Sequence, residues 1–247
     1  QPALDQAIQA RQGGTHLLAV AAPADLSVES LRSLRTALQF AMLHAPNRVI
    51  VLTGPTPGIG KSFISASLAA IMAATGKRVL LIEADMRKGH LHDVFGVKRS
   101  PGLSELVATI QPLEPVLRPQ VVAGLDLIPG GAIPPNPAEL LLSLSTGDWL
   151  QRLQDQYDLV LIDTPPVLAV SDACVLAQRA GTVLLVARAE TTTLGELQET
   201  AKRLAQAGGS VRGVGFNGLA FKRRYGYGYG YRYQRYDYGT PPKAPKA

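Results

Sequence analysis

Runs of consecutive apolar residues alternate with segments of helical periodicity along most of the chain. The clearest runs predict buried strands, and a weaker one predicts another at 125–129. The clear strands are expected at 48–53, 78–84, 158–164, 182–188 and 212–217. The runs lack polar alternation, as is typical of strands covered by helices on both faces. The pattern predicts an α/β fold with a doubly wound, mostly parallel sheet.

The segments between these strands have the apolar spacing of helices. They are expected at 61–75, 136–144, 171–179 and 193–207. Gly76 and Gly208 follow two of them, where glycine commonly ends a helix. Ahead of the first strand, 27–43 carries leucines at near-helical spacing, with Ser27 as the expected N-cap.

The two ends of the chain lack such patterns. Residues 1–24 are rich in Ala and Gln and are predicted to be a linker or partly ordered lead-in. In 223–247, Gly alternates with Tyr and then Pro and Lys follow, so no apolar face exists. This segment is predicted to be a disordered, tyrosine-rich tail. One domain, 25–222, is left between them.

Composition agrees with one large domain and excludes several classes of protein. The 247 residues are 46% hydrophobic and 18% charged, which is enough chain for a sizeable core. Cys174 is the single cysteine, so neither a disulfide framework nor a cysteine metal cluster can form within one chain. No apolar run approaches the roughly 18 residues of a membrane span, and no signal peptide is visible.

The net charge of +6 lies entirely in the last 26 residues, 222–247. From Lys222 onward the chain has seven Lys or Arg against Asp237, whereas the remainder has 18 basic and 18 acidic residues. A basic tail of this kind indicates a solvated extension or an electrostatic contact with phosphate or a membrane.

A phosphate-binding loop is predicted at Gly54–Ser62, which follows a predicted strand and opens a predicted helix. There the backbone N–H groups and the helix N-terminus would face a polyphosphate. Lys61 would reach the β- and γ-phosphates, and the Ser62 hydroxyl would bind Mg²⁺. The strict pattern has its first Gly where this chain has Pro55, and the alternative is a turn that only caps a helix. We expect ATP with Mg²⁺.

Two further predicted strands end in carboxylates. Glu83 and Asp85 follow one apolar run, and Asp163 follows another. The carboxyl ends of parallel strands form the ligand edge of an open sheet, so Asp85 and Asp163 are expected to meet the same Mg²⁺. The alternative for each acid alone is a strand-end turn or a helix cap.

In combination these segments resemble the bacterial tyrosine kinases (BY-kinases), and in particular the cytoplasmic domain of Wzc-type capsule and exopolysaccharide co-polymerases. The resemblance rests on Gly54–Ser62, Leu81–Arg87 and Leu159–Pro166. It continues through Asp85–Gly89, Gly102–Glu105, Pro134–Pro137 with Glu139–Leu141, and Gly213–Asn217, and covers roughly 25–240. Partitioning ATPases carry a signature Lys where this chain has Thr56, which argues against that branch.

The resemblance implies a P-loop fold that transfers phosphate from ATP to protein tyrosine. It assigns catalysis to Lys61, Glu83, Asp85 and Asp163, and the metal to Ser62, Asp85 and Asp163. The nucleotide contacts that it implies are Gly58, Ile59, Gly60, Lys61, Ser62, Phe63 and Asn217.

Two of these implied roles have alternatives. Glu83 stands where the family usually has Asp, and would orient or deprotonate the attacking tyrosine; the alternative is a buried acid paired with Lys61 or Ser62. Asn217 would touch the adenine or cap its strand. His90 and His92 are predicted to lie in a surface loop, with the entrance of the site as the alternative.

Seven of the eight tyrosines lie in the tail, at Tyr225, Tyr227, Tyr229, Tyr231, Tyr233, Tyr236 and Tyr238. Nothing nearby in sequence buries their rings, so the segment is suited to enter an active site as an extended peptide. The resemblance implies phosphorylation by a neighbouring subunit, each phosphate adding about −1.5 to −2 charges. The alternatives are single-stranded nucleic-acid binding by Tyr, Arg and Gly, which we disfavour, and a tail without a partner.

Glu29, Arg32 and Arg35 are spaced at i, i+3 and i+6 on the first predicted helix. Spacing alone indicates a solvated intrahelical pair. The spacing matches the E-x-x-R-x-x-R motif of the resembled family, which implies a homo-oligomeric ring.

The resemblance also implies partners and a location. They are the polysaccharide polymerisation and export machinery, a phosphotyrosine phosphatase, and the cytoplasmic side of the bacterial inner membrane. Because the chain begins at Gln1 rather than Met, a membrane-spanning segment upstream is left open. We therefore expect an autokinase that regulates polysaccharide export. The alternative is a nucleotide-switch ATPase whose basic tail binds partners without being phosphorylated.

Overall fold

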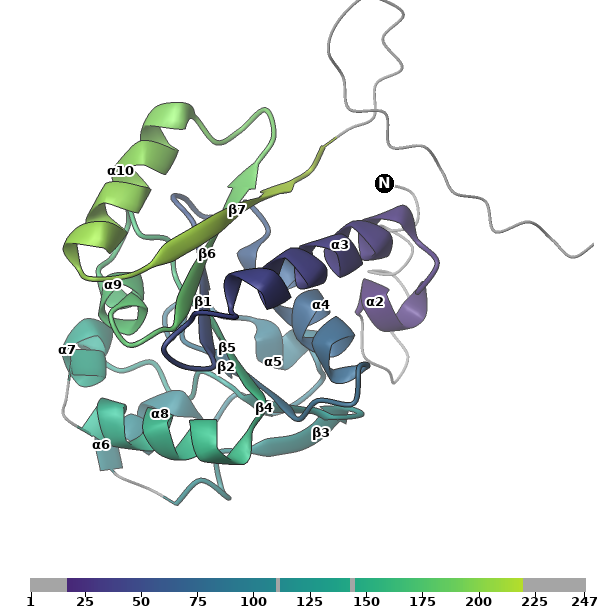
Figure 1. The fold of residues 1–247 in the computed structure, drawn as a ribbon. Helices are drawn as coiled ribbons and strands as arrows, with labels where there is room; N and C mark the ends of the chain where they lie inside the picture. Colours follow the sequence, from purple (N-terminus) through teal and green to yellow (C-terminus); the bar gives the residue numbers. More distant parts are fainter. Residues whose placement is uncertain (1–16, 110–111, 143–144, 220–247) are drawn as a thin grey trace, which may run out of the picture.

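A seven-stranded sheet lies between two layers of helices in the computed structural model, which describes residues 17–109, 112–142 and 145–219 (Figure 1). Its strands have the order β3-β4-β2-β5-β1-β6-β7. They are β1 Val49–Thr53, β2 Val79–Glu83, β3 Arg118–Val122, β4 Leu125–Ile128, β5 Leu159–Asp163, β6 Thr182–Arg188 and β7 Val211–Asn217. Every neighbouring pair is parallel except β3 with β4, so the carboxyl ends of six strands share one edge.

The helices divide between the two faces of the sheet. One face is covered by α2 Leu18–Ala21, α3 Leu26–Ala41, α4 Lys61–Ala73 and α5 Leu91–Val94. The other is covered by α6 Leu103–Thr109, α7 Pro137–Leu142, α8 Ser145–Gln156, α9 Asp172–Ala177 and α10 Leu194–Gln206. The doubly wound, mostly parallel sheet that the sequence predicts is therefore confirmed.

The central strands are apolar on both faces because each face packs against helices. In β1, Ile50 and Leu52 join the core under α3 and α4, whereas Val49 and Val51 join the core under α9 and α10. All four side chains are fully buried. This is why uninterrupted apolar runs, rather than alternating ones, marked the strands.

All six strands expected from sequence are present, with ends that differ by at most one residue. The sequence analysis missed β3, α2, α5, α6 and α8. The edge strand β3 pairs on one side only, through an irregular antiparallel register, and Gln120 within it has φ 53°. A short edge strand needs no apolar run, so it leaves no such signal.

The predicted N-cap of α3 is wrong by two residues. The Asp25 carboxylate accepts a hydrogen bond from the Ser27 backbone N–H at 2.7 Å, so Asp25 is the N-cap and the helix begins at Leu26. Asp and Ser cap equally well, and the sequence presents both within three residues. The glycines expected to end two helices do adopt positive φ, 84° at Gly76 and 83° at Gly208.

Part of the segment assigned to the lead-in belongs to the core. Leu17 and Leu18 are buried against the cluster that α3 and α4 form on the sheet. The domain boundary at residue 25 stays a prediction. Across the described ranges, none of the helices combines the length and hydropathy that crossing a bilayer requires.

We expect Leu17→Ala to lower the free energy of unfolding by about 2–4 kcal/mol, because it removes a fully buried side chain from the core. Urea denaturation of the purified chain measures the change. Val20→Ala is the matched control, since Val20 is 49% exposed on the same helix, and it should cost less than about 0.5 kcal/mol. Equal stability of both variants would show that the lead-in packs only loosely.

Candidate active site

The loop between β1 and α4 has the backbone conformation of a phosphate cradle. Gly58 and Gly60 have φ of 75° and 93°, and α4 begins at Lys61, so successive N–H groups turn toward one concave face. A Cβ at Gly54 would lie 2.5 Å from the Val186 carbonyl oxygen. The close packing of β1 against β6 therefore accounts for a glycine at position 54.

Lys61 is a buried cation near two acids but in contact with neither. Its side chain donates to the Thr56 carbonyl oxygen at 3.3 Å, and the residue is only 8% exposed. Burial lowers the pKa of Lys61, whereas the negative charges of Asp163 and Asp85 act to raise it. In the described part of the chain, no carboxylate lies within 4 Å of its ammonium group. A polyphosphate would supply the missing negative charge.

Asp163, at the end of β5, is a fully buried carboxyl group. It accepts a hydrogen bond from the Ser65 hydroxyl at 2.8 Å. Burial raises the pKa of Asp163 to about 6, although hydrogen bonds from Ser62 and Ser65 and the charge of Lys61 act in the opposite direction. A divalent cation beside it would favour the ionised form, so the residue fits a Mg²⁺ site.

The other expected metal residues lie on the same edge. Ser62 is half-buried at the start of α4, and Asp85 follows β2, whose Glu83 is in register with Asp163 of β5. Asp85 accepts hydrogen bonds from the Arg87 and Lys88 N–H groups, as the strand-end turn would require.

No group of three or more His, Cys, Asp or Glu side chains in the described ranges is arranged to hold a metal alone. Mg²⁺ at nucleotide sites is typically held by one or two carboxylates together with phosphate oxygens, so the assignment of Ser62, Asp85 and Asp163 to the metal stays a prediction.

Glu83 lies in a cradle of backbone atoms. Its two carboxylate oxygens accept hydrogen bonds from the Leu91 N–H and, at 2.8 Å, from the Gly130 N–H, and the residue is fully buried. Two glycines leave room for it: a Cβ would lie 2.5 Å from the carboxylate at Gly89 and 3.3 Å at Gly130. Glu83 therefore joins the loop after β2 to the loop after β4.

These partners differ from those expected. The sequence alternative pairs Glu83 with Lys61 or Ser62, but its hydrogen bonds go to the opposite side, along the sheet edge. His92 Nδ1 lies 3.3 Å from the Glu83 carboxylate, and the His92 side chain is 15% exposed. The prediction of a surface loop is therefore wrong for His92, whereas His90 is exposed.

The far side of the P-loop is held by the ends of β6 and β7. The Asn217 amide donates to the Ile59 carbonyl oxygen at 2.9 Å, and a side chain at Gly60 would collide with it. Arg188 contacts the Gly58 carbonyl oxygen at 3.5 Å. The adenine contact expected of Asn217 stays a prediction; the contact observed positions the loop.

The remaining expected residues lie as follows. Ile59 is fully buried, and Phe63, on α4, is partly buried against the core. The Arg32 guanidinium meets the Glu29 carboxylate at 2.9 Å on the exposed side of α3, whereas the buried Arg35 Nε has no hydrogen-bond partner among the described residues. The seven tail tyrosines lie outside the described residues.

Sequence reasoning missed Ser65, Arg188 and Asp172 at this edge, and gave His92 a place near the site only as an alternative. Ser65, which binds Asp163, follows Lys61 by one helical turn, so helical spacing could have indicated it. His92, Arg188 and the buried Asp172, which lies 3.5 Å from Arg87, depend on contacts between distant segments. No local pattern indicates such contacts.

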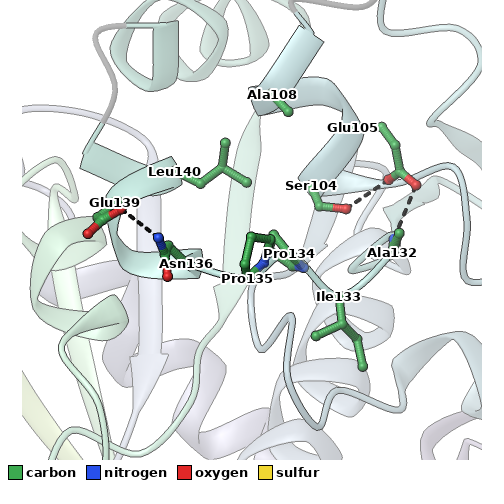
Figure 2. Close-up of a pocket in the computed structure, with 10 residues that line it drawn as sticks. All are labelled: Ser104, Glu105, Ala108, Ala132, Ile133, Pro134, Pro135, Asn136, Glu139 and Leu140. Carbon is green, nitrogen blue, oxygen red and sulfur yellow. Dashed lines mark hydrogen bonds between the residues drawn. The ribbon is translucent and has the colours of Figure 1, made fainter.

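A groove of about 410 Å³ opens beside the loop after β4 (Figure 2). It is formed by the start of α6, the loop 132–136 and the start of α7. Gly130, which binds Glu83, lies two residues before this loop. The edge thus presents, in order, the Asn217 contact, the P-loop, the buried acids and the groove.

Residues 47–209 match the family described as AAA domain. The chain is 55% identical to a putative tyrosine-protein kinase, EpsB of Ralstonia solanacearum, over 244 residues that cover 96% of this chain and 32% of that protein. It is 48% identical to the tyrosine-protein kinase wzc of Salmonella typhimurium, over 86% of this chain and 29% of that one.

Solved structures include a similar domain. The kinase domain of Escherichia coli tyrosine kinase ETK matches with a TM-score of 0.83 at 43% identity, covering 90% of this chain and 88% of that one. The present chain spans about a third of the length of the curated relatives it matches.

The raised pKa of Asp163 predicts that the free energy of unfolding of the nucleotide-free protein depends on pH. A carboxyl group whose pKa is higher folded than unfolded favours folding at low pH, and that contribution is lost as pH rises through about 6. Relative to Asp163→Asn, the wild type should lose about 2–3 kcal/mol between pH 4 and pH 7.5. Urea denaturation at both pH values tests this. Asp155→Asn, at an exposed position, serves as control; a pH-independent difference for Asp163→Asn would contradict the account.

Glu83→Asp should destabilise the protein, although Asp is the residue that the resembled family usually has. The shorter side chain would withdraw from the Leu91 and Gly130 N–H groups and leave them buried without partners, at a cost of about 2 kcal/mol or more. The urea midpoint, compared with that of Glu199→Asp, whose side chain is 44% exposed, measures the effect. A Glu83→Asp variant as stable as the wild type would mean that the cradle adapts to the shorter acid.

Proposed function

The chain belongs to the bacterial tyrosine kinases, and we propose that it binds ATP with Mg²⁺ on Gly58–Ser62 and transfers the γ-phosphate to tyrosines of a neighbouring subunit. The observation that carries the proposal is the buried ammonium group of Lys61, which follows the turn of Gly58 and Gly60 and contacts no carboxylate among the described residues. Asp163 and Asp85 lie near enough to lower the cost of burying it.

Catalysis would rest on alignment and charge. Bound Mg²⁺ would neutralise charge on the phosphates, with Ser62, Asp85 and Asp163 as its protein ligands. Lys61 would hold the β- and γ-phosphates as a donor with positive charge. Glu83 would act by fixing the loop that carries Asp85, since its own carboxylate is engaged by backbone N–H groups.

The acceptors we propose are the tail tyrosines Tyr225–Tyr238. The strand β7 ends at Asn217 on the same edge of the sheet as the P-loop, so the tail starts from the edge where phosphate is transferred. Three or four phosphates, at about −1.5 to −2 charges each, would cancel or invert the +6 charge of residues 222–247.

A homo-oligomeric ring would bring a neighbour's tail to each site. The motif Glu29, Arg32 and Arg35 lies on α3, where Arg32 and Glu29 form an exposed pair and the Arg35 side chain is only partly exposed. We propose this helix as the subunit contact. Change of the tail's charge by phosphorylation would then alter assembly through electrostatic repulsion.

The setting we propose follows from the same family. The chain would act at the cytoplasmic side of the inner membrane, together with the machinery that polymerises and exports polysaccharide, and a phosphotyrosine phosphatase would reverse the modification. Both sequence relatives named above are about three times as long as this chain, so these roles belong to the longer protein.

Incubation with MgATP should place phosphate on residues between Tyr225 and Tyr238, and Lys61→Met should abolish it, because the γ-phosphate then lacks its positively charged donor. Mass spectrometry of the tail measures both. Circular dichroism of the Lys61→Met chain serves as the control for folding. Hydrolysis of ATP without tail phosphate would favour the nucleotide-switch ATPase instead.

A further inference from the structure

The groove beside the loop after β4 combines apolar walls with acidic ends. Pro134 and Pro135 lie between α6 and α7, with Leu140 above them and Ile133 at the mouth (Figure 2). Ile133 is 62% exposed, so its apolar side chain is accessible to a docked segment. The volume of about 410 Å³ lies in the range of pockets that take small organic groups.

Two carboxylates stand on opposite sides of these prolines. Glu139 accepts a hydrogen bond from the Asn136 side chain at 2.9 Å and is exposed on α7. Glu105, on α6, accepts from the Ser100 and Ser104 hydroxyls and from backbone N–H groups. Although burial opposes it, these bonds lower the pKa of Glu105 to about 2. The groove therefore keeps negative charge at neutral pH.

The groove lies on the β2–β4 side of the phosphate site. Asn217 and Arg188 occupy the β6–β7 side of the P-loop, so the other approach runs along the ends of β5, β2 and β4. The strand β4 is three strand spacings from β1, or roughly 14 Å. Between the ends of β2 and β4, the Glu83 carboxylate accepts a hydrogen bond from the Gly130 N–H and so links the two loops.

We propose that this groove docks the Tyr225–Tyr238 segment of a neighbouring subunit while that segment is phosphorylated. The inference rests on the proposed function and names the surface that holds the acceptor. One tyrosine ring lies against Pro134 and Pro135, arginines of the segment pair with Glu105 and Glu139, and a second tyrosine reaches the P-loop.

The choice of the tail segment as the docked peptide rests on its positive charge and on the distance that it can span. The chain from Lys222 onward carries +6, whereas the groove carries two carboxylates. An extended chain covers roughly 14 Å in four residues, and its side chains alternate in direction. Tyrosines at every second position from Tyr225 to Tyr233 therefore share one face, and two of them four residues apart span the groove and the P-loop.

Phosphorylation would also release the docked segment, because it reverses the charge that holds the segment in the groove. A phosphotyrosine adds about −1.5 to −2 charges and would meet the carboxylates of Glu105 and Glu139. The groove therefore holds the unmodified basic segment and repels the phosphorylated one. Each phosphate that is transferred therefore weakens the binding of the phosphorylated segment to the groove.

The test uses the full chain with its seven tail tyrosines replaced by Phe as the phosphate donor, and a peptide of residues 223–239 as the acceptor. Glu139→Lys and Ile133→Lys, each introduced into this donor, should raise the KM for the peptide about fivefold or more. The kcat should change little, and the affinity for MgADP should stay the same, because neither side chain touches the P-loop. Glu199→Lys, an equal charge change on α10 at the opposite edge, is the control and should leave KM unchanged.

A second measurement compares peptides. Fluorescence anisotropy should show that a triply phosphorylated 223–239 peptide binds the donor at least tenfold more weakly than the unmodified peptide, and that added salt weakens the unmodified one. An unchanged KM in both groove variants, or equal affinity for the two peptides, would overturn the docking site. A donor that leaves every peptide unphosphorylated would instead contradict the proposed function.

Discussion

The burial of opposite charges at one edge of the sheet is the constraint on which the rest of the structure depends. Lys61 and Asp163 are both taken out of water, yet they do not form a direct ion pair. Burying a charge costs free energy, because the charge loses its hydration. Hydrogen bonds and a bound ligand of opposite charge must compensate for that loss. The hydroxyl groups of α4, the turn at Asp85 and the glycines of the P-loop all serve that arrangement. The parallel sheet collects them, because it brings the ends of β1, β2 and β5 together.

The two sides of this edge are held by different means. On the side of β6 and β7, Asn217 fixes the P-loop through the Ile59 carbonyl group. On the side of β2 and β4, the buried Glu83 carboxylate ties two loops together through Leu91 and Gly130. The first contact shapes the donor site, and the second shapes the surface over which an acceptor must approach. Phosphoryl transfer depends mainly on the alignment of donor and acceptor. A tyrosine kinase domain of this kind therefore needs both the Asn217 contact and the Glu83 contacts.

The central strands and α4 could be predicted from sequence because their burial on both faces and the Gly-Lys-Ser turn are local patterns. The edge strand β3 could not, since it buries little, and the cap of α3 was assigned to Ser27 although Asp25 competes for the same role. The positions of Lys61, Asp85 and Asp163 on one edge follow from parallel topology alone. The partners of Glu83 do not, because Gly130 lies 47 residues away and its N–H carries no side-chain signal.

The central claim is that the edge of one subunit phosphorylates the tail of another, and mixing two disabled chains tests it most directly. One chain carries Lys61→Met and an intact tail; the other has an intact P-loop and Phe at all seven tail tyrosines. Incubated together with γ-labelled ATP and Mg²⁺, they should yield label on the Lys61→Met chain alone, at a rate that rises with the concentration of the other chain. Absence of label from the mixture, while the wild type alone labels its tail independently of concentration, would contradict transfer between subunits.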